Sequence, residues 1–469
     1  MRRGQQIRQR RPPTAASHPM RPLSTTATSA AAAHQPRHGW RRRCAAGAAV
    51  AAALLAAALF LALARVATVV PPAPAATTTS SSYRSRGSRG PTLVDLTLVR
   101  GAVEKGAVCL DGTPPGYHFL PGFGEGSDKW LVYLDGGSWC RNVTWCAQRK
   151  NTDLGSSDYM ERRVAFIGIL SDDESHNPDF YNWNKVRVRY CDGASFAGNV
   201  DEEVKVCMNG TSFFFRGQRI WEAVMGELLS KGLANSKQAL LTGCSAGGLT
   251  TYIHCDDFRA LLPKETTVKC LADGGFFLDV KDISGQRFMR NFYTDVVQLQ
   301  DLRKRFPLCS SYLEPGQCFF PRELLKGITT PMFILNSAYD AWQVEHALSP
   351  EGTDPKKLWH DCRLDITKCS SKQIEILQGL RKALLEAISE FKNKRDWGMF
   401  INSCFIHCQS TENVTWHSPS AARINNKTVA EAVGDWFFNR RDVKEIDDCE
   451  YPCNPTCYSL VLDHPFPEE

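Results

Sequence analysis

A glycine-rich pentapeptide between two segments of different periodicity is the feature that most restricts the fold of this 469-residue chain. Gly243-Cys244-Ser245-Ala246-Gly247 follows the apolar run 238–242 and precedes the helix-like pattern of 247–262. Glycines two places before and after a serine permit a sharp strand–helix turn, because side chains there would crowd the backbone. Such a turn presents the hydroxyl above a sheet. The motif therefore predicts Ser245 as a nucleophile; a serine that only packs in a tight turn is the alternative.

Strand and helix patterns alternate along most of the chain. Strands are expected at 129–134, 238–242, 331–335 and 398–401, and helices at 218–233, 247–262, 371–393 and 429–438. This alternation predicts an α/β-hydrolase-like fold, with a mostly parallel central sheet flanked by helices. Cysteine-rich, turn-rich stretches at 191–215, 309–320 and 449–457 predict loops stabilised by disulfides.

The eighteen cysteines indicate an oxidising compartment. Four glycosylation sequons agree with passage through the secretory pathway, since each asparagine has threonine two places on: Asn142, Asn209, Asn413 and Asn426. Seventeen cysteines follow Cys44, so at least one has no partner within that part of the chain. Cys244 is a candidate for this unpaired thiol, because a residue beside the nucleophile is usually buried and constrained.

The N-terminal region differs in composition from the rest. We predict five segments: a disordered Arg-rich tail (1–43), an apolar signal anchor or signal peptide (44–64), a linker (65–91), a catalytic domain (92–460) and a C-terminal tail (461–469). Arginines 41–43 precede the apolar segment, so the positive-inside rule places the remainder in the lumen. A cleaved signal peptide with a long basic region is the alternative to an anchor.

The positive net charge comes from the tail alone. The chain carries +6, but residues 1–43 hold ten arginines and no Asp, Glu or Lys. Without those ten arginines, 46 basic residues face 50 acidic ones. A protein that binds nucleic acid would carry its positive charge on the folded part, so no nucleic-acid partner is expected.

A Gly-Gly pair after an early strand is a candidate oxyanion hole. Gly136 and Gly137 follow the strand expected at 129–134, and backbone N–H groups of such a turn can approach a substrate oxygen. We expect the N–H of Gly137 or Ser138 to act together with that of Ala246. Trp139 either lines the cleft or packs in the core.

A nucleophilic serine needs a general base and an orienting carboxylate, in the chain order Ser, acid, His on this type of fold. Asp340 follows the strand expected at 331–335 and is our choice of acid; a helix or turn cap is its alternative. His407 follows the strand at 398–401 and lies between two cysteines that could hold it rigidly. His417, in a more polar loop, is the second candidate for the base.

The Cys404-x-x-His407-Cys408 cluster could instead belong to a metal site. An oxidising compartment and the lack of a second cluster with zinc-like spacing argue against this reading. We therefore expect neither a metal nor an organic cofactor.

Five ordered motifs make the chain resemble plant pectin acetylesterases and, more distantly, the animal Notum carboxylesterases. They are VYLDGGSWC (132–140), YCDGASFAG (190–198), GCSAGGL (243–249), NSAYDAWQ (336–343) and SCFIHCQ (403–409). The resemblance implies a catalytic triad of Ser245, Asp340 and His407. It implies hydrolysis of acetyl esters on the galacturonan of pectin, releasing acetate, in the plant cell wall. The long N-terminal tail departs from a short signal peptide, so a Golgi type II membrane protein is the alternative location.

Three other functions remain open at this point. A lipid-directed carboxylesterase of the Notum type would need a deep apolar pocket, whereas a pectin enzyme needs an open groove that tolerates a polyanion. A non-catalytic, membrane-anchored carbohydrate-binding protein could use the same scaffold. A serine peptidase is not excluded by any local feature, although the flanking motifs do not resemble one.

Overall fold

The computed structural model describes residues 90–206 and 211–459, all within one compact unit that comprises residues 78–469. The predicted tail (1–43), the apolar segment (44–64) and Asn209 lie outside the described residues. No helix among the described residues is long and apolar enough to cross a bilayer.

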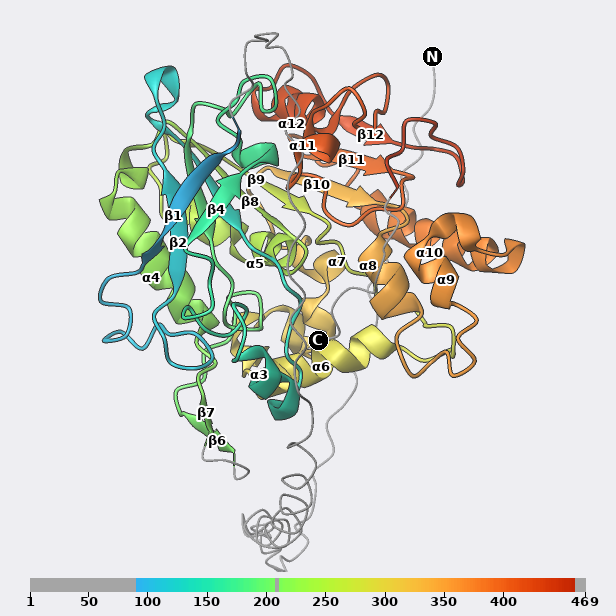
Figure 1. Cartoon of the computed structure of the whole chain (residues 1–469), viewed down its shortest axis with the longest axis horizontal. Helices are drawn as coiled ribbons and strands as arrows, with labels where there is room; N and C mark the ends of the chain where they lie inside the picture. Colours follow the sequence, from blue (N-terminus) through green and yellow to red (C-terminus); the bar gives the residue numbers. More distant parts are fainter. Residues whose placement is uncertain (1–89, 207–210, 460–469) are drawn as a thin grey trace, which may run out of the picture. The chain divides into compact units, whose positions relative to one another are not determined.

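A ten-stranded sheet forms the centre of the described structure, in the order β12-β11-β10-β9-β8-β3-β5-β2-β1-β4 (Figure 1). From β12 to β5 all neighbours are parallel, and β2, β1 and β4 continue the sheet through antiparallel pairs. The strands are β1 (Thr92–Leu98), β2 (Gly116–Leu120), β3 (Lys129–Leu134), β4 (Arg163–Phe166), β5 (Asn184–Val188), β8 (Gln238–Cys244), β9 (Thr267–Asp273), β10 (Met332–Ser337), β11 (Gly398–Asn402) and β12 (Lys444–Ile446). A separate hairpin joins β6 (Val204–Val206) to β7 (Thr211–Phe213). The predicted α/β-hydrolase-like class is confirmed.

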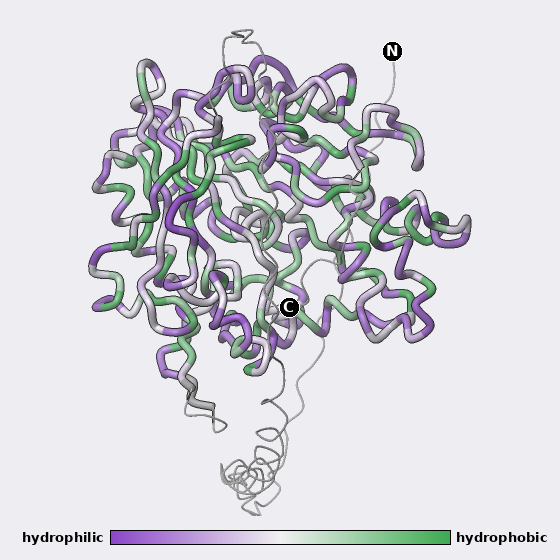
Figure 2. The backbone as a smooth tube through the Cα atoms, in the orientation of Figure 1, coloured by the Kyte–Doolittle hydropathy of each residue, from purple (hydrophilic) through white to green (hydrophobic). Residues whose placement is uncertain are grey.

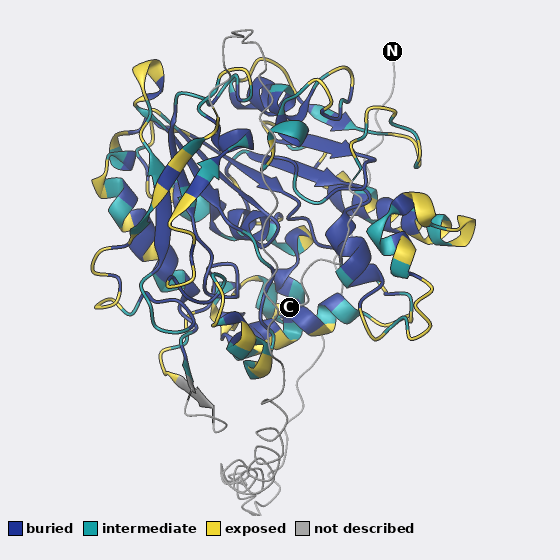
Figure 3. Cartoon of the chain, viewed as in Figure 1, coloured by how far each residue is buried: buried dark blue, intermediate teal, exposed yellow. Residues whose placement is uncertain are grey.

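Helices cover both faces of the sheet. They are α3 (Val143–Arg149), α4 (Gly217–Ser230), α5 (Ala246–Ala260), α6 (Phe288–Leu299), α7 (Pro321–Leu324), α8 (Ala341–Gln343), α9 (His360–Leu364), α10 (Ser371–Ser389), α11 (Asn413–Trp416) and α12 (Val429–Phe437). Successive residues of β8 show the two faces: Ala239 and Leu241 belong to the core with α4 and α5, whereas Leu240 belongs to the core with α12. The central strands are accordingly buried (Figure 3), and hydrophilic residues concentrate on peripheral loops (Figure 2).

The eight predicted elements all exist, with ends displaced by a few residues. The helix expected at 371–393 is α10, and Ser370 and Gln373 form a capping box at its start. The strand expected at 238–242 extends to Cys244. The antiparallel strands β1, β2 and β4 and the parallel strands β5, β9 and β12 were not predicted from the sequence. The burial pattern of β1 is irregular, and β4 and β12 have only four and three residues.

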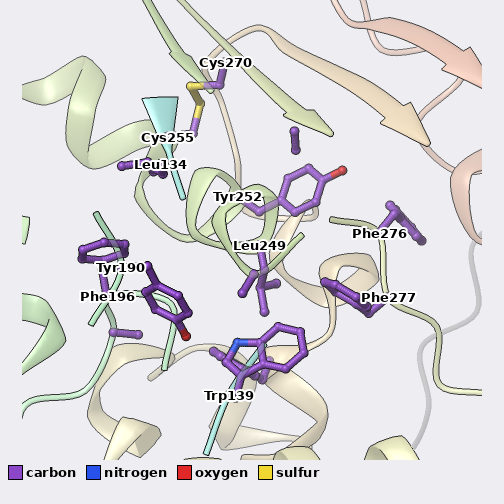
Figure 4. Close-up of a cluster of buried hydrophobic side chains, with 14 of the residues drawn as sticks. Leu134, Trp139, Tyr190, Phe196, Leu249, Tyr252, Cys255, Cys270, Phe276 and Phe277 are labelled. Carbon is purple, nitrogen blue, oxygen red and sulfur yellow. A yellow bond between two sulfur atoms is a disulfide. The ribbon is translucent and has the colours of Figure 1, made fainter. Parts of the chain in front are cut away.

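Trp139 packs in the core. It is fully buried and meets Phe277 and Tyr293 edge to face, with ring centroids 4.9 and 5.1 Å apart. Figure 4 shows it below Leu249 of α5, the helix that follows the candidate nucleophile. The open question of whether Trp139 lines a cleft is thus answered in favour of packing.

Residues 90–206 and 211–459 contain eight disulfides, most of which hold loops, as predicted. The pairs are Cys109–Cys191, Cys140–Cys146, Cys244–Cys408, Cys255–Cys270, Cys309–Cys318, Cys362–Cys369, Cys404–Cys457 and Cys449–Cys453. The proposal that Cys244 is the unpaired thiol was wrong, because Cys244 is bonded to a loop 164 residues away. Sequence distance hid this partner, which the parallel strands β8 and β11 bring to the same edge of the sheet.

Candidate active site

The predicted site residues converge at the carboxyl ends of parallel strands. Ser245 follows β8, the turn 136–138 follows β3, Asp340 follows β10 and His407 follows β11. Parallel strands end at one common edge, which is where α/β proteins place their ligand sites. A cavity of about 690 Å³ opens there, and Ser245, His407 and the turn 136–138 line it.

The nucleophile turn has the strained geometry that its glycines permit. Ser245 adopts φ 59° and ψ −125° between β8 and α5, a conformation that non-glycine residues rarely occupy. A Cβ on Gly243 would lie 2.4 Å from the carbonyl oxygen of Gly247, and one on Gly247 would lie 2.1 Å from that of Leu134. Both glycines are therefore required for close packing of the turn against β3.

The turn after β3 lies directly against the nucleophile. A Cβ on Gly136 would stand 2.8 Å from the Cβ of Ser245, so only glycine fits there. Gly137 and Ser138 follow with φ of 132° and 47°. Within residues 90–206 and 211–459, their N–H groups donate to no backbone acceptor. Ala246 begins α5, so its N–H has no acceptor within the helix.

The motif at 190–198 ties this turn to the nucleophile helix. The hydroxyl of Tyr190 donates to the carbonyl of Ser138 over 2.7 Å and accepts the N–H of Ser195. The hydroxyl of Ser195 donates to the carbonyl of Ala246 and accepts the indole N–H of Trp139. All these atoms are buried, so the network fixes the two groups of candidate oxyanion donors relative to each other.

Asp340 and His407 form a buried hydrogen-bonded pair. Nδ1 of His407 lies 2.8 Å from Oδ2 of Asp340, and the two side chains are 8% and 2% exposed. The other carboxylate oxygen accepts the N–H of Gln343 at 2.9 Å, so Asp340 also caps α8. Asp340 thus caps a helix and also pairs with His407, and its role as the acid of a triad stays a prediction. With Nδ1 on the carboxylate, Nε2 is the ring nitrogen left to exchange a proton.

A second aspartate, which sequence reasoning missed, holds the histidine loop. Oδ2 of Asp273, at the end of β9, accepts the N–H groups of Gln409 and Ser410 at 2.7 Å each. Burial raises the pKa of Asp273. A Cβ on the next residue, Gly274, would lie 3.3 Å from the ring of His407, so the imidazole packs against bare backbone.

The other histidines occupy different positions. His417 contacts Thr428, with Nδ1 3.0 Å from its hydroxyl, and does not line the Ser245 cavity. His346 packs against Trp342 with the rings tilted and their centroids 4.8 Å apart, and burial lowers its pKa to about 4, so this imidazole stays neutral. Of the two candidates for the base, only His407 meets the predicted acid.

Disulfides enclose His407 as the sequence suggested. Cys404 is bonded to Cys457, and Cys408 to Cys244. The sulfurs of Cys244 and Cys408 lie within 4.8 Å of a His407 ring nitrogen. A zinc site would use these sulfurs as thiolates. Cys244, Cys404, Cys408 and Cys457 are all held in disulfides and offer no thiolate. These cysteines therefore fit a structural role better than the role of metal ligands.

The Cys244–Cys408 bridge links the residue before Ser245 to the residue after His407, so its removal should impair turnover. In the double variant Cys244→Ser/Cys408→Ser we expect kcat for a reaction at Ser245 to fall about 10- to 100-fold, because small displacements of reacting groups have effects of this size. KM should change little. Cys309→Ser/Cys318→Ser is the matched control, since it removes a bridge that does not line the Ser245 cavity. Equal losses of kcat in both pairs would contradict a specific role.

Charged residues on one wall of the cavity were also missed. Asp135 accepts from Arg187 at 2.7 Å and pairs with Arg189 at 3.3 Å. Arg189 continues the network to Asp153 at 2.8 Å. A signal existed in the sequence: Asp-Gly-Gly occurs directly after β3 and again at the end of β9, at 135–137 and 273–275. The repeat marks two strand ends where backbone segments approach closely.

The predicted glycosylation sites differ in exposure. Asn142 and Asn426 are exposed, and Oδ1 of Asn142 accepts the N–H of Trp145 at 3.0 Å as the N-cap of α3. Asn413 is half-buried and its Oδ1 accepts the N–H of Gly168 at 2.7 Å. Modification at these positions stays a prediction.

Comparisons with known proteins point to one family. The family model described as pectinacetylesterase matches residues 88–458. Pectin acetylesterase 5 of Arabidopsis thaliana is 55% identical over 379 residues, which cover 80% of this chain and 88% of that protein. Pectin acetylesterase 4 of the same plant is 53% identical over 366 residues, covering 78% and 88%. The palmitoleoyl-protein carboxylesterase notum1a of Danio rerio is 26% identical over 380 residues, covering 75% and 70%.

Proposed function

Because the chain belongs to the pectinacetylesterase family, we propose that it is a serine esterase that removes acetyl groups from the homogalacturonan of pectin. The observation that carries the mechanism is the buried hydrogen bond between His407 and Asp340, beside a cavity that His407 shares with Ser245. Residues 92–460 are its catalytic domain. Acetylated pectin is its substrate and partner.

The first half-reaction forms an acetyl-enzyme. Nε2 of His407 takes the proton of the Ser245 hydroxyl as the oxygen attacks the acetyl carbonyl carbon. Asp340 keeps the proton on Nδ1 and stabilises the imidazolium that results. The oxyanion accepts hydrogen bonds from the N–H groups of Ala246 and of Gly137 or Ser138. Collapse of this intermediate breaks the ester bond, and His407 returns its proton to the departing sugar oxygen.

The second half-reaction releases acetate. Water enters where the sugar hydroxyl left, and His407 takes one of its protons as the oxygen attacks the acetyl carbon. The same N–H groups hold the second oxyanion. The bond to Ser245 then breaks and the serine oxygen recovers its proton from His407. The nucleophile, the proton carrier and the oxyanion donors of this proposed cycle all belong to the chain itself.

The eight disulfides support synthesis in the secretory pathway, because such bonds persist in oxidising compartments. The final location of the protein depends on whether the predicted apolar segment 44–64 is cleaved. Cleavage after it sends the enzyme to the cell wall, and retention anchors it in Golgi membranes as a type II protein. Sequencing the N-terminus of the mature protein distinguishes them.

Acetate release from acetylated homogalacturonan tests the proposed substrate. We expect the purified enzyme to release acetate from this polymer and to hydrolyse 4-nitrophenyl palmitate at least about 100-fold more slowly, as kcat/KM. Faster hydrolysis of the long-chain ester would favour the lipid-directed alternative. Labelling by a fluorophosphonate probe addresses the non-catalytic alternative, because the probe reacts only with an activated serine.

A further inference from the structure

A second cavity adjoins the cavity of Ser245. It measures about 550 Å³ and lies between α3, α6 and residues 342–352. Three residues line both cavities: Ser138, Gln148 and Trp342. A ligand longer than one sugar can therefore extend from the nucleophile into this second space, which we name the Arg141 cavity after its central cation.

Aromatic side chains form much of the wall of the Arg141 cavity. Trp145 comes from α3 and meets Phe292 of α6 edge to face at 6.0 Å. Phe288 and Trp342 complete this group of rings. Flat aromatic faces suit the C–H faces of sugar rings as well as acyl chains, so the apolar wall alone does not distinguish these two classes of ligand.

The charge of Arg141 does distinguish them. Its guanidinium lies 4.9 Å from the ring of Trp145 and 5.5 Å from each ring of Phe288 and Phe292, so cation–π contacts hold it in place. Its ion-pair partner is Asp295, half-exposed and 3.7 Å away, which is a long contact. Nε of Arg141 is buried and has no hydrogen-bond partner among the described residues.

The Arg141 side chain is 26% exposed, so its terminal N–H groups can reach a ligand. A guanidinium binds a carboxylate well, because its planar fork matches two carboxylate oxygens. An acyl chain in the same space would remove water from the charge and give no hydrogen bond in return, which is unfavourable. His346, also in the lining, is neutral through burial, so Arg141 supplies the positive charge. Glu351 is exposed in the same lining.

We propose that the Arg141 cavity is a subsite for a uronate residue of an acidic polysaccharide, next to the acetylated sugar at Ser245. The inference rests on the proposed function and adds a specificity determinant to it. Arg141 pairs with the carboxylate of the neighbouring sugar, and the rings of Trp145 and Trp342 pack on the sugar faces. The enzyme then prefers segments of the polymer with a free carboxylate beside the acetyl ester.

The test compares acetylated oligogalacturonates that carry free carboxylates with the same oligomers after methyl esterification. We expect the wild-type enzyme to prefer the free acid, and Arg141→Gln to lower that preference, as a ratio of kcat/KM, by about tenfold, mainly through KM. Arg163→Gln removes an exposed arginine of edge strand β4 and should keep the wild-type ratio. Asp295→Asn removes the carboxylate that competes for Arg141 and should lower KM for the free acid about twofold.

An unchanged ratio in Arg141→Gln, or no change of KM in Asp295→Asn, overturns the proposal. The second variant predicts tighter binding, a result that misfolding cannot imitate. Activity that rises from 4-nitrophenyl acetate to the octanoate, and rises further in Arg141→Gln, would assign the cavity to an acyl chain. Failure of the proposed function looks different: the wild-type enzyme would then hydrolyse 4-nitrophenyl acetate and release no acetate from either form of the polymer.

Discussion

Replacing Ser245 with alanine should lower kcat for acetate release from acetylated homogalacturonan by at least about 10⁴-fold. In the proposed mechanism this hydroxyl forms the covalent bond to the acetyl group, and no neighbouring hydroxyl occupies the strained turn between β8 and α5 that presents it. The loss of one oxygen atom should leave the fold intact. Acetate release under saturating polymer measures the effect, and Tm from circular dichroism should stay within a few degrees of the wild type.

Ser230→Ala is the matched control, because Ser230 is exposed at the end of α4 and does not line the Ser245 cavity. It should retain wild-type turnover and fluorophosphonate labelling, whereas the Ser245 variant should lose both. Acetate release by the Ser245 variant at more than about a hundredth of the wild-type rate would refute the assignment of the nucleophile.

Replacing His407 with alanine should lower kcat by about 10³- to 10⁴-fold, with little change in KM. In the proposed mechanism the imidazole accepts the proton of Ser245, and the buried carboxylate of Asp340 would keep only its hydrogen bond to Gln343. Initial rates of acetate release at several substrate concentrations separate the two parameters.

His417→Ala provides the contrast, since this histidine contacts Thr428 and is absent from the lining of the cavity. Its turnover should stay within about threefold of the wild type. The reverse pattern, a large loss in the His417 variant and a small one in the His407 variant, would reassign the general base.

Several elements follow directly from local sequence. The strands β3, β8, β10 and β11 are short apolar runs buried on both faces, so their composition alone identifies them. The turn at Ser245 also follows from local sequence. Its glycines are needed because a Cβ there would clash with the backbone of the turn itself or of the adjacent β3. Chain order then limited the acid and the base to a few residues.

Other features could not be obtained from local patterns. The antiparallel strands β1 and β2 depend on pairing with each other and with β5. The partner of Cys244 depends on the positions of β8 and β11 in the sheet. The preference for His407 over His417 depends on the distance from each histidine to Asp340. That distance is known only once the fold places the loop after β11 beside Asp340.

By itself, the sequence determined the class of fold, the family motifs and the residue types of the candidate triad. Each of these depends on periodicity or on neighbours a few residues apart. Tertiary structure alone decided which cysteines meet, how the loop at 190–196 fixes the candidate oxyanion turn, and that Arg141 lies among aromatic rings beside the Ser245 cavity. Those contacts join residues far apart in the chain, and parallel strands bring their carboxyl ends together only when the sheet has formed.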